Sequence, residues 1–153
     1  MAWSSSTNGA VEGDAVLVAD LAPGFDFTRE ILLTAELGLG DLSLVEEDRG
    51  LASVVLWHSA ALAEGRPKDE VRVLKLAARD GRAFDAGIAA TEAAAARLGI
   101  RRVAVRCQTR YGDAFRRLIG RGYRVRWTDL RMTYEGYPER HPTGGVLFSN
   151  WEI

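Results

Sequence analysis

Residues 71–99 constrain the fold of this chain more than any other stretch. Residues 71–77, VRVLKLA, alternate apolar with polar side chains and predict a buried strand that carries Val71, Val73 and Leu76. The alanine-rich residues 83–99, AFDAGIAATEAAAARLG, combine high helix propensity with a terminal glycine and predict a helix. A strand followed by a helix after so short a polar link predicts an α/β domain built in layers.

Periodicity and turn signals predict the other elements, and we treat residues 14–153 as a single domain. Residues 1–13 are expected to be a flexible N-terminal segment. Further strands are predicted over 14–21, in a hairpin over 42–59, and over 101–107, 123–134 and 144–153. Further helices are predicted within 22–38 and over 112–122. The fold class is therefore α/β, with a mixed, largely antiparallel sheet flanked by helices.

Composition excludes several classes of protein. The 153 residues, of which 47% are apolar, suffice for one domain with its own core. Cys107 is the only cysteine, so the chain forms no intrachain disulfide, which fits a reducing cytoplasm. Cys107 and the two histidines, His58 and His141, form no metal-ligand pattern. No apolar run approaches the ~18 residues that a membrane span needs.

Charge is distributed unevenly, although the net charge is only −1. Residues 1–96 hold 8 Lys and Arg against 16 Asp and Glu, whereas residues 97–131 hold 11 Arg against 2 acids. The basic block is a candidate surface for phosphate or nucleic acid. The alternative is a solvated face that balances the acidic residues within one fold. The block lacks the aromatic and basic alternation of a base-stacking surface, which favours the alternative.

Three stretches in this order resemble the GNAT superfamily of acyl-CoA N-acyltransferases. They are LSLVEEDRGLASVVLWH, VRVLKLAARDGRAFDAG and YGDAFRRLIGRGY, and the resemblance runs from Val16 to Tyr134. It implies a GNAT-like fold, with acetyl-CoA as cosubstrate and an amine of a small molecule or protein as acceptor. It also implies a homodimer as a possible assembly, and neither a metal nor any other cofactor.

The third stretch is the most specific part of the resemblance. The family pattern is N-x-x-A-x-x-x-Y-x-x-x-G-F/Y, and its spacing is met by Tyr111, Ala114, Leu118, Gly122 and Tyr123. Three of these five positions agree with the family in residue type. Leu118 stands where many members carry the tyrosine that protonates the departing CoA thiolate. That role is then left to Tyr111, Tyr123 or water.

The link after the strand is where the family binds the cofactor diphosphate, on Q/R-x-x-G-x-G/A at a helix N-terminus. Two alignments are open. If the helix keeps its length, Arg79, Arg82 and Phe84 fill the motif and both glycines are lost. If the link gains one residue and the helix ends a turn early, Arg82, Asp85 and Gly87 fill it. We favour the second alignment because it places Gly87 at a helix start.

The arginines of this link have two interpretations. In the first, Arg79 and Arg82 donate charge-assisted hydrogen bonds to phosphate. In the second, Asp80 or Asp85 caps the helix and both arginines are solvated.

Acetyl transfer needs a general base that accepts a proton from the amine. Glu70 and Asp69, at the start of the strand, and His58, at the end of the hairpin, are the candidates. The resemblance also implies that backbone N–H groups hold the thioester oxygen. The residues that would supply these groups are Leu76, Ala77 and Ala78.

For four other side chains, a structural role is favoured over a functional one. Cys107 is expected to be a buried, inert thiol rather than a nucleophile. Three tryptophans are expected to line the core or a cleft rather than to form a substrate cage: Trp57, Trp127 and Trp151.

Three functions remain open. The first is a GNAT-type N-acetyltransferase. The second is a catalytically inactive GNAT-like domain used for binding, regulation or dimerisation, such as the degenerate half of a two-domain acetyltransferase. The third is a nucleic-acid module that uses the basic block, whose binding would weaken steeply with salt.

Overall fold

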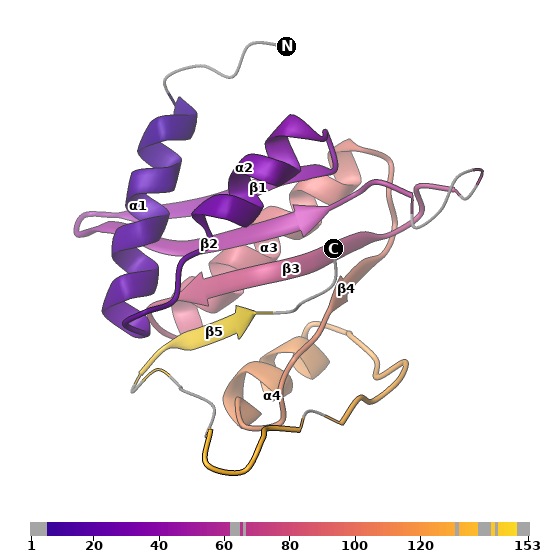
Figure 1. Cartoon of the computed structure of the whole chain (residues 1–153). Helices are drawn as coiled ribbons and strands as arrows, with labels where there is room; N and C mark the ends of the chain where they lie inside the picture. The colour runs from indigo at the N-terminus through magenta and orange to yellow at the C-terminus, as the bar shows by residue number, and fades with distance from the viewer. Residues whose placement is uncertain are drawn as a thin grey trace.

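The computed structural model describes residues 6–61, 65, 67–130, 132–137, 142 and 144–149. These residues form one five-stranded sheet with helices on both faces (Figure 1). The helices are α1 (Ser6–Leu21), α2 (Thr28–Glu36), α3 (Gly81–Arg97) and α4 (Gly112–Gly120). The strands are β1 (Gly40–Glu47), β2 (Gly50–His58), β3 (Val71–Ala78), β4 (Val103–Val105) and β5 (Val146–Ser149). The predicted fold class, α/β with a largely antiparallel sheet flanked by helices, is confirmed.

Strand β3 is the centre of the sheet. The strand order is β1-β2-β3-β4, with β5 also paired to β3. Strand β2 pairs antiparallel with both β1 and β3. The other edge of β3 is divided, because β4 pairs parallel with Val71–Val73 and β5 pairs antiparallel with Lys75–Ala78. The last strand in the sequence therefore lies beside the C-terminal half of β3 (Figure 1).

Two apolar clusters, one on each face, hold the helices to the sheet. Helices α3 and α4 cover one face, where Phe84, Ile88 and Leu118 pack with Phe148 of β5. Helices α1 and α2 cover the other face, where the buried side chains include Leu17, Val18, Phe27 and Ile31. Among the described residues, no helix has the length and apolar character needed to cross a membrane.

The first element differs from the prediction. Residues 6–21 form helix α1, so the predicted strand over 14–21 is wrong. Part of the segment predicted to be flexible, residues 6–13, forms the first half of this helix. Residues Asp14, Leu17 and Val18 are buried at helical spacing, and Leu21 is partly buried. A short apolar run is compatible with either element, so periodicity alone does not separate them. Residues 1–5 lie outside the described residues.

The C-terminal third also differs from the prediction. Residues 123–130 and 132–134 contain no strand, so the prediction over 123–134 is wrong for them. The strand predicted over 144–153 is β5, Val146–Ser149, and residues 150–153 lie outside the described residues. Helix α4 buries Ala114 and Leu118, whereas Phe115 and Ile119 are 39% and 44% exposed.

Candidate functional site

The N-termini of α3 and α4 lie at the same end of the molecule and border a hollow of about 410 Å³. Residues Arg79 and Asp80 join β3 to α3, and the Asp80 carboxylate accepts a hydrogen bond of 2.8 Å from the Ala83 N–H. This cap satisfies one of the amide groups that a helix N-terminus leaves unpaired. The predicted cap is confirmed for Asp80, whereas Asp85 pairs with Arg117 instead.

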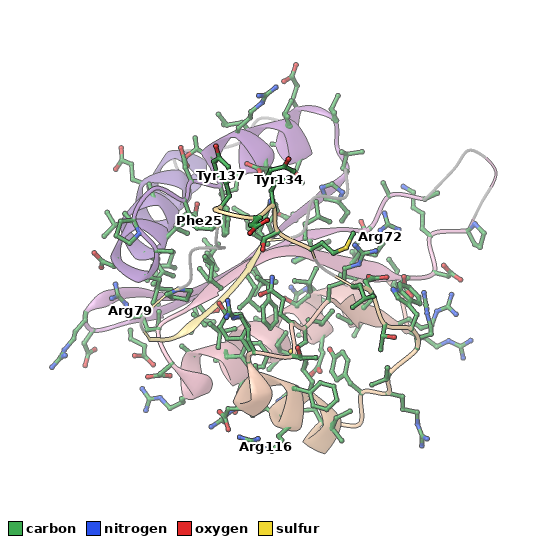
Figure 2. All side chains as sticks on the ribbon, turned by 60° about the horizontal axis from the view of Figure 1, so that its bottom comes forward. Phe25, Arg72, Arg79, Arg116, Tyr134 and Tyr137 are labelled. Carbon is green, nitrogen blue, oxygen red and sulfur yellow. The ribbon has the colours of Figure 1, made fainter. Side chains whose placement is uncertain are left out.

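Basic and acidic side chains line this hollow together. Arg79, Arg110 and Arg117 contribute three guanidinium groups, and Asp80 and Asp113 contribute two carboxylates. Figure 2 shows Arg79 from this side of the molecule. Anions favour a helix N-terminus because the helix dipole and the free N–H groups point at it. The hollow therefore combines three guanidinium groups, which attract phosphate, with two carboxylates, which repel it.

Arg117 links the two helices across the hollow. Its Nη1 donates to Asp85 Oδ2 of α3 at 2.5 Å, and its Nε donates to Asp113 Oδ2 of α4 at 2.6 Å. The guanidinium lies over Gly81, where an added Cβ would be 2.7 Å from it. Hydrogen bonds to Asp113 and, less strongly, to Asp85 raise the pKa of Arg117. The hydrogen bond from Arg117 in turn lowers the pKa of Asp113. These partners hold the Arg117 guanidinium at the start of α3.

The residues expected to hold the thioester oxygen are paired on both sides. Leu76, Ala77 and Ala78 face Val55, Val54 and Ser53 of β2. On the other edge they face Phe148, Leu147 and Val146 of β5. All three are fully buried. In this arrangement, β5 occupies the strand edge that a bound thioester would need.

Gly145 sets the close approach of β5 to this strand. Its φ is +72°, and an added Cβ would be 2.4 Å from the Ala78 carbonyl oxygen. Only glycine fits a left-handed conformation at so short a distance from neighbouring backbone.

Gly87 does not lie at a helix start, so this basis for the second alignment is wrong. Helix α3 begins at Gly81, and Gly87 is buried in its second turn against β2. Close packing explains why this position is a glycine, because an added Cβ would be 2.4 Å from Ser53 Oγ and 3.1 Å from Val55. The helix keeps its length, as the first alignment requires.

The two arginines of the link contact protein groups. Arg79 Nε donates to the Leu51 carbonyl oxygen at 3.0 Å, and its Nη1 lies 3.5 Å from Asp20. Arg82 pairs with Glu47 at 2.7 Å, and its side chain is 81% exposed. Arg79 lines the hollow and Arg82 does not. The structure thus separates the two arginines that the sequence grouped together.

His58 and Glu70 lie at one end of the sheet, at the end of β2 and just before β3. His58 pairs with Arg72 in the register, and its Nε2 lies 2.9 Å from Thr34 Oγ1 of α2. Burial, helped by the Arg72 charge, lowers the pKa of His58, so the imidazole is neutral at pH 7. Glu70 is buried and accepts a hydrogen bond of 2.6 Å from Arg126.

The candidate acids lie on the other face of the sheet. Tyr123 packs against the α3 and α4 core, whereas His58 contacts α2. The Tyr123 hydroxyl is buried without a hydrogen-bond partner among the described residues, and burial, followed by the Glu92 charge, raises its pKa. Tyr111 lines the hollow, and its ring is 5.4 Å from that of Phe148. The structure therefore does not bring Tyr123 together with His58.

The remaining predicted side chains have structural partners. Asp69 pairs with Arg102. Trp57 is buried and donates to Ser43 Oγ at 2.9 Å, whereas Trp127 is half exposed. Burial raises the pKa of Cys107 to about 11, which favours the inert thiol. Trp151 lies outside the described residues. The described residues contain no cluster of three or more metal-ligating side chains.

Internal acids neutralise much of the basic block. Six of its arginines form ion pairs within the chain, which favours the balanced-face interpretation over nucleic-acid binding. These arginines are Arg102, Arg106, Arg116, Arg117, Arg121 and Arg126.

A buried polar group beneath α1 and α2 was missed by the sequence analysis. Lys75 Nζ donates to Ser149 Oγ at 3.0 Å and pairs with Glu30 at 3.2 Å. Asp14 is fully buried, and neither of its carboxylate oxygens has a hydrogen-bond partner among the described residues. The spacing of three residues between Asp14 and Leu17 could have indicated that Asp14 is buried, but only if residues 14–21 had been predicted to form a helix.

Fold and site define an α/β protein with an anion-compatible hollow at two helix N-termini. Two solved structures resemble it, both of the protein TTHA1254 from Thermus thermophilus. A mutant form gives a TM-score of 0.64 and the wild type 0.63, each at 17% identity over 90% of this chain and 100% of that chain. The likeness shows the fold alone. No family model matches the sequence, and no curated protein matches it.

Proposed function

We propose that this chain is a GNAT-like domain that binds the diphosphate of an acyl-CoA between the N-termini of α3 and α4. Acetyl-CoA is the first acyl-CoA to test. The observation that carries the proposal is the hollow at these two termini, with Arg79, Arg110 and Arg117 in its wall. Guanidinium groups and helix N-termini are the groups that bind phosphate. The hollow also begins at the link where the GNAT resemblance expects the diphosphate.

We assign this domain a binding or regulatory role in preference to acetyl transfer. Strand β5 pairs with the edge of β3 that would hold the thioester, from Leu76 to Ala78. Leu118, at the position of the expected acid, is buried in the core and has no proton to give. We place the domain in the cytoplasm, because the only cysteine, Cys107, forms no disulfide.

N-acetyl transfer to an amine of a small molecule or protein is the second candidate. The observation that favours it is the neutral imidazole of His58, a base suited to pH 7, at the same end of the sheet as the carboxylate of Glu70. This function requires β5 to leave the edge of β3 when the cofactor binds.

Thermal melts and calorimetric titration with acetyl-CoA test the binding proposal. A ligand at about 100 times its dissociation constant stabilises the folded state by roughly 2.7 kcal/mol. Arg110→Ala should weaken binding and flatten its salt dependence, because Arg110 lines the hollow and is exposed. Arg97→Ala is the matched control, since Arg97 lies in the last turn of α3, at the opposite end of that helix. No stabilisation by millimolar acetyl-CoA contradicts the proposal.

A thiol-release assay separates the two roles. The protein is incubated with acetyl-CoA and a panel of amines, and free CoA is followed. Binding without amine-dependent CoA release supports the binding role. Release that His58→Gln abolishes, with binding unchanged, supports the acetyltransferase.

A further inference from the structure

Glycine at position 81 leaves room for the guanidinium of Arg117 at the first turn of α3. A Cβ added to Gly81 would be 2.7 Å from Nε, Cζ and Nη2 of Arg117. Gly81 is not among the glycines at positive φ, so close packing rather than backbone conformation accounts for it. A side chain at position 81 would therefore displace the guanidinium from the start of the helix.

The start of a helix is an unfavourable place for a cation on its own. The partial positive charge of a helix N-terminus attracts anions and repels guanidinium groups. Arg117 is nevertheless held there by two carboxylates, Asp85 of α3 and Asp113 of α4. The pair with Asp85 is partly buried, because the two side chains are 37% and 34% exposed, whereas Asp113 is 63% exposed. The aspartates therefore supply the negative charge that both the helix start and Arg117 favour.

The hydrogen bonds of Arg117 leave one of its nitrogens for a ligand. Nη1 donates to Asp85 and Nε donates to Asp113, whereas Nη2 donates to no other described residue. Nη2 lies beside Gly81, which lines the hollow. A guanidinium binds phosphate most firmly through two neighbouring nitrogens. A phosphate at Arg117 therefore has to share or take a nitrogen that an aspartate holds, and sharing places two negative groups side by side.

We propose that Asp85 keeps the hollow in a self-paired state of low affinity for anions, and that a phosphate-bearing ligand displaces Asp85 from Arg117. The ligand then accepts hydrogen bonds from Nη1 and Nη2 together, while Asp113 stays on Nε and holds Arg117 to its own helix. This inference rests on the proposed function, because it describes how the same hollow is regulated. Because only molecules in which the pair is open bind at full strength, the pair raises the observed dissociation constant.

A second ion pair between the same two helices provides a matched control. Arg121, at the C-terminal end of α4, pairs with Glu92 of α3 at 2.5 Å, the same distance as between Arg117 and Asp85. Neither Glu92 nor Arg121 lines the hollow. Glu92→Gln therefore removes an equivalent pair without changing the hollow.

Calorimetric titration of the full chain with inorganic pyrophosphate tests the proposal. Asp85→Asn should lower the dissociation constant about two- to fivefold, the range that a partly exposed ion pair supports, whereas Glu92→Gln should bind like the wild type. Asp85→Ala, which also removes the charge, should give the same gain, and circular dichroism checks that each variant is folded. Asp85 variants that bind pyrophosphate no more tightly than the wild type overturn the proposal, and so does the absence of pyrophosphate binding in all of them.

A double-mutant cycle separates displacement of Asp85 from the mere loss of one negative charge. Arg117→Gln removes the guanidinium, so Asp85→Asn should bring no gain in pyrophosphate affinity in that background. A gain of the same size with and without Arg117 shows that charge alone acts, and it overturns the proposal. Acetyl-CoA binding by the wild type is measured separately and decides the proposed function. A wild type that binds acetyl-CoA while Asp85→Asn gives no gain contradicts this inference and leaves that function standing.

Discussion

Gly87 of α3 lies against Ser53 of β2 so closely that a methyl group at position 87 would be 2.4 Å from Ser53 Oγ. Gly87→Val should therefore lower the free energy of unfolding by roughly 1–3 kcal/mol, through overpacking. Denaturant unfolding measures the change. Gly120→Val in α4 is the control, because nothing lies within 4 Å of a Cβ at Gly120. Acetyl-CoA affinity should be unchanged in the folded variant, since Gly87 does not line the hollow; selective loss of affinity would restore the second alignment.

The cap at Asp80 should contribute measurably to stability. Asp80→Ala removes the acceptor of the Ala83 N–H and should cost about 1 kcal/mol, whereas Asp80→Ser should retain most of that stability. Urea unfolding of both variants compares them. Asp48→Ala, in the exposed turn between β1 and β2, is a control without a cap. Equal losses for the alanine and serine variants would show that the cap is not what stabilises α3.

Asp14 should make stability fall as pH rises. Burial raises the pKa of Asp14 from 3.8 to about 7 in the folded chain, and the negative charges of Asp26 and Glu30 add smaller contributions. The protonated acid therefore favours the folded state, and its contribution is full below pH about 4 and lost as pH rises through 7. Asp14→Asn should be more stable than the wild type at pH 8 by on the order of 4 kcal/mol, and the difference should shrink toward pH 4.

Thermal or urea unfolding at several pH values measures this difference. Comparing variant with wild type cancels His58, whose lowered pKa gives the opposite slope, with stability lost as pH falls below 6.5. Glu12→Gln, exposed on the same helix, should give a flat difference. A flat difference for Asp14→Asn as well would contradict the buried, uncompensated carboxyl.

Cys107 should react slowly with alkylating reagents in the folded protein. With its pKa raised to about 11, the thiolate fraction at pH 8 falls about a hundredfold below that of the ordinary thiol. Iodoacetamide labelling followed by mass spectrometry gives the rate, with the urea-unfolded chain as control. Similar rates in the two states would show a reactive thiolate and reopen its nucleophilic role.

Local sequence signals were enough to predict β3 and α3. Val71, Val73 and Leu76 are buried in β3, of which every residue but Arg72 is buried. The alanine run that follows is α3, with Gly99 at positive φ after its end. The strand prediction over 14–21 was wrong because a run of eight residues contains too few helical turns to show helical spacing. The strand prediction over 123–134 was wrong because a strand also needs a neighbouring strand, which side-chain alternation does not supply.

The candidate site depended on contacts between distant residues. The cap at Asp80 was foreseen, since a cap acts within one turn. Arg117 belongs to the basic block, for which no partner could be predicted, yet it bonds Asp85, 32 positions away, because the starts of α3 and α4 meet. The burial of Leu76 to Ala78 by β5 had no local signal either. Such pairings are fixed by topology rather than by nearby sequence.

The pairing of β5 with β3 also sets an order of events during folding. Lys75 and Ser149, which bond in the finished sheet, are 74 positions apart, so this part of the sheet closes late. Until β5 pairs with it, the edge of β3 from Lys75 to Ala78 is open, and Phe84 lacks its aromatic neighbour Phe148. An open edge of this kind recruits strands from other chains. A nascent chain that stalls before residue 146 is therefore a substrate for chaperones or a seed for aggregation.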